Sequence, residues 1–113
     1  MKLVDIAAAL GCEALTPLDG VADIDTVVAS DGMSEILAFH TPGAVMLTGL
    51  TNIQSVRTAV VADVHAIIYV RGKQPPEAVR QLACDKGIPL LSTQLGMFDS
   101  CGILYTTGLK GAM

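Results

Sequence analysis

The sequence predicts a three-layer α/β sandwich, in which helices cover both faces of a mainly parallel sheet. The length of 113 residues suits a single hydrophobic core, and we expect one domain over residues 1–113. From residue 44 onward, short apolar runs alternate with helix-like stretches, which is typical of repeated strand–helix–strand units. Short connections and the lack of a linker or repeat indicate that these units share one sheet.

The first third of the chain carries weaker signals. Apolar residues recur at helical spacing over residues 3–10, so we expect a helix that ends at Gly11. Asp5 interrupts this apolar stretch, which therefore resembles a signal peptide only superficially. The other elements expected in this part are a strand near "EALT" (13–16), a strand "TVVAS" (26–30) and a helix from Ser34 to about Phe39.

From residue 44 the strand and helix signals are clearer. "AVML" (44–47) is typical of a buried parallel strand, and Thr51 or Asn52 can cap the helix that follows. "AIIYV" (66–70) is β-branched and aromatic, which predicts a second buried strand. The elements expected beyond these are a helix after residue 52 with Ile53, Val56 and Val60 inside, a helix from Pro76 to Lys86 closed by Gly87, a strand at 88–92, and a helix at 97–105 that buries Phe98, Cys101 and Tyr105, followed by a partly frayed tail.

Charge and hydropathy limit the classes of partner. Seven Lys and Arg residues against 11 Asp and Glu residues give a net charge of −4. Because negative charge repels nucleic-acid backbones and anionic membranes, we expect neither as a partner. No stretch is long and uncharged enough to span a bilayer. Hydrophobic residues make up 51% of this small chain, which favours burial at a subunit interface and hence a homodimer.

The cysteines and histidines indicate no metal or catalytic site. Cys12, Cys84 and Cys101 are odd in number and far apart, so we expect reduced, mostly buried thiols in a cytoplasmic protein. His40 and His65 lie at no ligand spacing from a cysteine, and we interpret both as structural. We therefore expect no cofactor, no metal and no catalytic residue.

Polar and basic residues follow four of the predicted strands. Carboxyl ends of parallel strands share one edge of a sheet, where α/β proteins bind ligands, and helix N-termini attract anions. The sequence therefore predicts a site for a small phosphorylated ligand at this edge. The candidate ligand-binding residues are Ser30, Asp31, Thr48, Gly49, Thr51, Asn52, Arg71, Lys73, Ser92 and Thr93, within loops that also include Gly32, Gln74 and Gln94.

The same residues have a simpler, structural interpretation. The only role of Gly49 is then to form a turn, and the polar residues that follow each strand can cap the next helix. Under this interpretation Arg71 and Lys73 are solvated turn charges. The pattern G-x-x-x-x-G-K-[ST] is absent, so the turn is not a P-loop. Helix caps proposed under this interpretation are Asp31 or Ser34, Thr51 or Asn52, and Ser92 or Thr93.

Four segments in order, "ASDGMSEILAF", "MLTGLTN", "AIIYVRGKQP" and "IPLLSTQLGMFD", together resemble the DRTGG domain. This small α/β module is related to the N-terminal domain of the HPr serine kinase/phosphorylase and accompanies CBS domains in pyrophosphatases. The D-R-T-G-G run itself, expected near "VADIDTVVAS", is absent, and Asp25 and Thr26 are its only remnants. The resemblance implies a dimer-forming, regulatory or ligand-sensing role without catalysis.

These observations lead to two functional hypotheses. The first is a non-catalytic regulatory domain that binds a small phosphorylated ligand, such as an adenine nucleotide, at the carboxyl edge of the sheet. The alternative is a homodimerisation or docking module for an unidentified protein partner, with no small ligand. An enzyme, for example a phosphotransferase, is disfavoured because the kinase chemistry of the relatives belongs to a separate P-loop domain.

Overall fold

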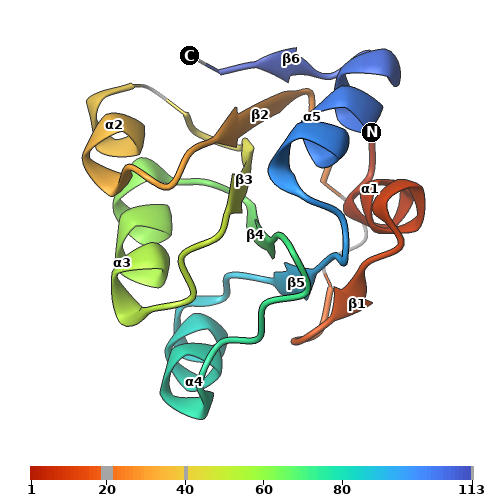
Figure 1. Ribbon diagram of the computed structural model, residues 1–113. Coiled ribbons are helices and arrows are strands. Elements are labelled where there is room, and N and C mark those ends of the chain that lie inside the picture. Colours follow the sequence, from red (N-terminus) through yellow and green to blue (C-terminus); the bar gives the residue numbers. More distant parts are fainter. Residues whose placement is uncertain (19–21, 40, 113) are drawn as a thin grey trace.

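Residues 1–18, 22–39 and 41–112 are described by the computed structural model (Figure 1). His40, expected to be a structural helix-end residue, lies outside the described residues. The elements, in chain order, are α1 (Leu3–Leu10), β1 (Glu13–Ala14), β2 (Thr26–Ala29), α2 (Met33–Ala38), β3 (Val45–Thr48), α3 (Ile53–Ala62), β4 (Ala66–Tyr69), α4 (Glu77–Lys86), β5 (Leu90–Ser92), α5 (Met97–Thr106) and β6 (Lys110–Gly111).

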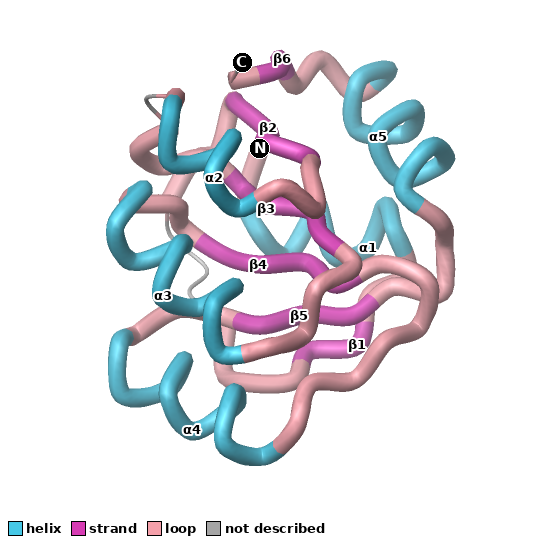
Figure 2. The backbone as a smooth tube through the Cα atoms, turned by 60° about the vertical axis from the view of Figure 1, so that its left-hand side comes forward, coloured by secondary structure: helices cyan, strands magenta, loops and turns pink. Residues whose placement is uncertain are grey.

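The sheet has the strand order β1-β5-β4-β3-β2-β6. Strands β2 to β5 are parallel neighbours, β6 adds a parallel strand beside β2, and β1 is antiparallel to β5. Helices α2, α3 and α4 cover one face, while α1 and α5 cover the other, as Figure 2 shows from the side. The prediction of a three-layer α/β sandwich with a mainly parallel sheet is therefore confirmed.

Both faces of the central strands are buried. Every residue of β3, β4 and β5 is buried, which explains why these strands read as continuous apolar runs. Alternate side chains enter opposite cores, because successive residues of a strand point to opposite faces. Met46, Ile67 and Tyr69 pack under α2 to α4, whereas Leu47 and Ile68 pack under α1 and α5.

The ends of α1 and α4 and the start of α3 agree with the sequence prediction. Gly11 and Gly87 close α1 and α4 with φ of 61° and 69°, a left-handed conformation that glycine adopts without a steric cost. Asn52 caps α3 by accepting a hydrogen bond from the N–H of Ser55 at 3.1 Å. Pro76 is the N-cap of α4 rather than its first helical residue.

Three expected core residues lie at the surface instead. Phe98 and Tyr105 of α5 are 88% and 76% exposed, and Val60 of α3 is 40% exposed. The buried residues of α5 are Ser100 and Leu104, four positions apart, so these two side chains face the sheet. The prediction that α5 buries Phe98 and Tyr105 is wrong. The helix is rotated about its axis so that Ser100 and Leu104 face the sheet.

The tail and the cysteines also differ from expectation. Residues Lys110 and Gly111 form β6 beside β2, where a frayed end was expected. All three cysteines are free thiols, but Cys84 is exposed and Cys12 and Cys101 are half-buried, so the expected burial is only partial. No helix in the described part of the chain is both long and apolar enough to span a bilayer.

Candidate functional site

Four loops lie along the carboxyl edge of the sheet. They follow β2, β3, β4 and β5, which are adjacent and parallel, so residues 30–32, 48–52, 71–74 and 92–94 must share one rim. Hydrogen bonds join neighbouring loops directly. The N–H of Gly72, for example, donates to the carbonyl of Thr93 at 2.7 Å. The predicted juxtaposition of the four loops is therefore confirmed.

The Asp31 side chain bridges the loop after β2 to the turn after β3. Its Oδ1 accepts hydrogen bonds from the backbone N–H of Gly49 at 2.7 Å and from the hydroxyl of Thr48 at 3.0 Å. The Gly49 hydrogen bond lowers the pKa of Asp31, assisted by Thr48 and by the charges of Arg71 and Lys73, against a smaller opposing effect of burial. Asp31 is therefore a fixed negative charge at neutral pH.

Asp31 does not cap a helix, contrary to the structural interpretation. Helix α2 follows Gly32 and has no side-chain cap hydrogen bond, so the expected cap by Asp31 or Ser34 is wrong. Ser30 instead accepts the N–H of Gly32 at 2.9 Å. The Asp31 carboxylate instead accepts a hydrogen bond from the backbone N–H of Gly49, in the short turn after the neighbouring strand β3.

Gly49 leaves room for the guanidinium group of Arg71. A Cβ atom at residue 49 would collide with Nη2 of Arg71, whereas Gly49 itself is buried beneath that group. Arg71 and Gly72 both have positive φ, of 61° and 67°, and the N–H of Lys73 donates a hydrogen bond to the carbonyl of Val70 at 3.4 Å. This tight turn presents Arg71 at the rim, where its charge acts on Asp31.

Other candidate residues are committed to internal hydrogen bonds. Ser92 and Thr93 are 4% and 1% exposed, and their hydroxyls donate to the carbonyls of Lys73 and Leu10 at 2.9 and 2.7 Å. They do not cap α5, whose N-cap is Gly96. Ser92 and Thr93 therefore position the rim. Among the candidate residues, Asp31, Asn52, Arg71 and Lys73 face solvent, and Ser30 and Thr51 are half-buried; Gln74 and Gln94 of the same loops are also exposed.

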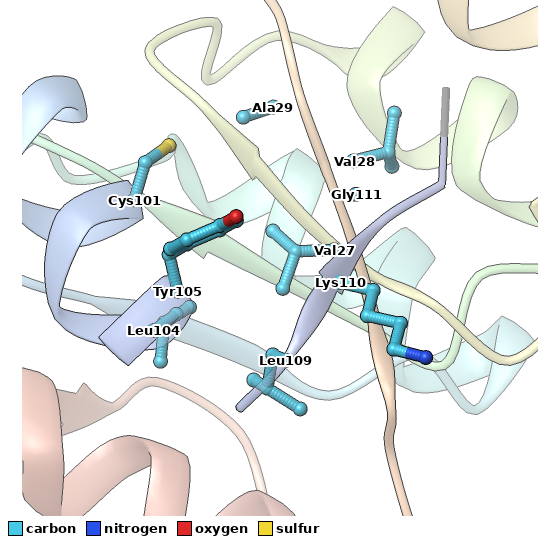
Figure 3. Close-up of a pocket in the computed structure, with 9 residues that line it drawn as sticks. All are labelled: Val27, Val28, Ala29, Cys101, Leu104, Tyr105, Leu109, Lys110 and Gly111. Carbon is cyan, nitrogen blue, oxygen red and sulfur yellow. The ribbon is translucent and has the colours of Figure 1, made fainter. Parts of the chain in front are cut away.

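An apolar pocket lies beside β2 at the β6 edge of the sheet, and Ala29, which directly precedes the rim residue Ser30, is among the residues that line it. It has a volume of about 210 Å³ and lies between β2, α5 and β6, with the ring of Tyr105 beside Val27 (Figure 3). Lys110 is the charged residue among those that line it. No sequence pattern predicted this pocket, because β6 is only two residues long and pairs with a strand that is about 80 residues earlier in the chain.

The His and Cys side chains form no metal centre within the described residues. In the described ranges, no three His, Cys, Asp or Glu side chains gather as a metal site would require. His65 precedes β4, at the amino end of the strand, so it lies on the edge opposite to Asp31. Burial raises the pKa of the Cys12 thiol to about 11, and that of Cys101 is also raised.

Fold and rim together define a small open α/β domain with a charged carboxyl edge. The model of the DRTGG domain matches residues 5–106, and the chain belongs to this family. The predicted resemblance is therefore confirmed. No curated protein matches the sequence.

A similar solved structure is that of the CBS and DRTGG domains of the regulatory region of Clostridium perfringens pyrophosphatase, complexed with its activator, diadenosine tetraphosphate. The TM-score is 0.71 at 19% sequence identity, over 91% of this chain and 45% of that chain. This chain thus spans about half the length of that regulatory region. This similarity shows the fold of the chain. The nucleotide is bound to the pyrophosphatase regulatory region, which contains both the CBS and the DRTGG domains.

Proposed function

We propose that this chain is a non-catalytic regulatory domain that binds a small phosphorylated ligand, such as an adenine nucleotide, at the carboxyl edge of its sheet. The observation that carries the proposal is that the Arg71 guanidinium lies against Gly49, to which Asp31 is hydrogen-bonded, and that Lys73 lies two residues further along the same exposed turn. Both cations are exposed, and neither forms an ion pair with a described residue. Their charges are therefore available to a phosphate group.

The family supports the regulatory part of the proposal. The DRTGG domain of the clostridial pyrophosphatase belongs to a regulatory region that binds a nucleotide activator. The regulatory region of that pyrophosphatase also contains CBS domains. The proposal for this chain therefore rests on its own rim residues together with its membership of the DRTGG family.

A catalytic role is disfavoured by the state of the acidic group at the rim. Asp31 has a lowered pKa and is therefore a weak base at neutral pH. His65, a side chain that could otherwise serve as a base, lies at the opposite edge of the sheet. Incubation with ATP or pyrophosphate is expected to give neither hydrolysis nor phosphotransfer, and a turnover that survives purification and is lost with Asp31→Asn would contradict this expectation.

Isothermal titration calorimetry against a panel of nucleotides tests ligand binding. The informative variant is Arg71→Gly, because glycine accepts the φ of 61° at this position, so the side chain with its guanidinium group is removed without straining the turn. Arg57→Ala is the matched control, since it removes one exposed cation from α3. We expect Arg71→Gly to weaken nucleotide binding by about 10-fold or more, and Arg57→Ala to leave it unchanged. No binding at millimolar concentration, or equal losses in both variants, would contradict the proposal.

The alternative is a homodimerisation or docking module without a small ligand. It is favoured by the exposed apolar side chains of α5, where Phe98 and Tyr105 reach solvent, and by Val61 of α3, which is 75% exposed. Sedimentation analysis distinguishes the two helices. If α5 forms the interface, Phe98→Ser gives a monomer while Val61→Ser leaves the dimer intact. A wild-type monomer at micromolar concentration would remove the homodimer from consideration.

A further inference from the structure

The turn between β3 and α3 is already filled by side chains of the protein itself. Asp31 accepts the N–H of Gly49, the hydroxyl of Thr48 accepts the N–H of Leu50 at 3.2 Å, and Asn52 accepts the N–H of Ser55. A bound phosphate would normally use such groups. Here the Asp31 carboxylate takes the place of an external anion, so this turn is not an open phosphate cradle.

Asp31 keeps one oxygen for a ligand. Its two hydrogen bonds both end on Oδ1, and no group in residues 1–18, 22–39 and 41–112 donates to Oδ2. The residue is exposed. An ionised carboxylate only accepts hydrogen bonds, so a ligand group that hydrogen-bonds to Oδ2 must be a donor. Arg71, whose guanidinium lies against the Gly49 turn, and Lys73, which follows it in the same turn, require an acceptor or an anion.

We infer, on the premise of the proposed function, that the ligand of this rim carries a hydroxyl or amine donor beside its phosphate. The donor binds Oδ2 of Asp31, and the phosphate binds Arg71 and Lys73. Nucleotides belong to this chemical class, because a ribose hydroxyl or an exocyclic amine accompanies the phosphates. An inorganic polyphosphate does not, since it offers only charge and is repelled by Asp31.

Gly49 makes this arrangement possible. Its missing side chain lets the Arg71 guanidinium lie against the turn to which Asp31 is bonded. The three atoms nearest to a Cβ at this position all belong to the flexible end of Arg71, so Gly49→Ala is expected to displace the guanidinium without disrupting the backbone. This substitution moves the cation away from Asp31 while the net charge of the protein is preserved.

Asp31→Asn distinguishes the two halves of the ligand. The amide oxygen can still accept from Gly49 and Thr48, so the loop connection is kept, but the negative charge and the second acceptor are lost. We expect the affinity for ATP to fall by about 10-fold or more, since a hydrogen bond to a charged acceptor is removed. The affinity for inorganic triphosphate is expected to stay equal or to rise, because the repulsion disappears. Circular dichroism and the melting temperature check that the variant is folded.

Gly49→Ala provides the complementary test. We expect both ATP and triphosphate to bind more weakly by several-fold, because both need Arg71. The inference is overturned if wild-type protein binds triphosphate as tightly as ATP, or if Asp31→Asn strengthens both; phosphate binding itself, and with it the proposed function, would then stand. If neither compound binds the wild-type protein, the inference and the proposed function are both overturned.

Discussion

The carboxylate of Asp31 accepts a hydrogen bond from the N–H of Gly49 at 2.7 Å, which joins the loop after β2 to the turn after β3. Eighteen residues separate the two partners in the chain. This contact decides the electrostatic character of the rim, because it places a fixed negative charge where a phosphate-binding turn would be positive.

The stability of the fold should depend on the ionisation of Asp31. Its folded-state pKa is lowered, mainly by the Gly49 N–H, so its contribution is present above the unfolded-state pKa of about 3.9 and is lost as the pH falls through the lower folded value. Urea unfolding of the wild type and of Asp31→Asn should show a gap that shrinks below about pH 4. A gap that stays constant from pH 7 into this acid range would contradict the assignment.

Two fully buried serines should respond oppositely to alanine. Ser55 donates to the carbonyl of Asn52 at 2.7 Å and shares a hydrogen bond of 2.8 Å with the hydroxyl of Tyr69, so Ser55→Ala should lower the free energy of unfolding by about 1–3 kcal/mol. Ser100 Oγ has no hydrogen-bond partner within the described residues. Ser100→Ala should therefore be neutral or slightly stabilising, and a loss as large as that of Ser55→Ala would show that its hydroxyl is bonded.

Alanine substitution of two glycines should change the stability of the fold in opposite directions, because the backbone conformations at the two positions differ. At Gly72, φ is 67° and a Cβ would lie 2.6 Å from Oε1 of Gln94, so Gly72→Ala should destabilise the fold by about 1–2 kcal/mol. Gly102 is exposed within α5, and a Cβ there meets nothing within 4 Å. Gly102→Ala should stabilise the fold by about 0.5–1 kcal/mol. Thermal unfolding measures both, and a stabilising Gly72→Ala would refute the turn geometry.

One thiol should react much faster than the other two. Cys84 is exposed on α4, whereas burial raises the pKa of Cys12 to about 11 and also raises that of Cys101. Because the thiolate is the reactive form, a disulfide reagent at pH 8 should label one cysteine rapidly. Cys84→Ser should abolish this fast phase. A fast phase that persists in the variant would place a second thiol at the surface.

The apolar periodicity was sufficient to predict the layers and most elements. Helix α1 and the capping of α3 by Asn52 agree with the sequence, because spacing and caps are local properties. The rotation of α5 was not predictable in this way. "MFDSCGILY" is apolar on more than one side, so only packing against the sheet could select Ser100 and Leu104 as the inner residues.

The sequence by itself determined which residues would meet at the carboxyl edge, since parallel strands fix the side on which their loops emerge. Only the tertiary structure decided what those residues do. Asp31 was compatible with a local helix cap, but its carboxylate bonds instead to Gly49 on the neighbouring loop, and Ser92 and Thr93 turn inward. Polar side chains can bond to donors and acceptors that are distant in the chain. These groups come close together only after the sheet has formed.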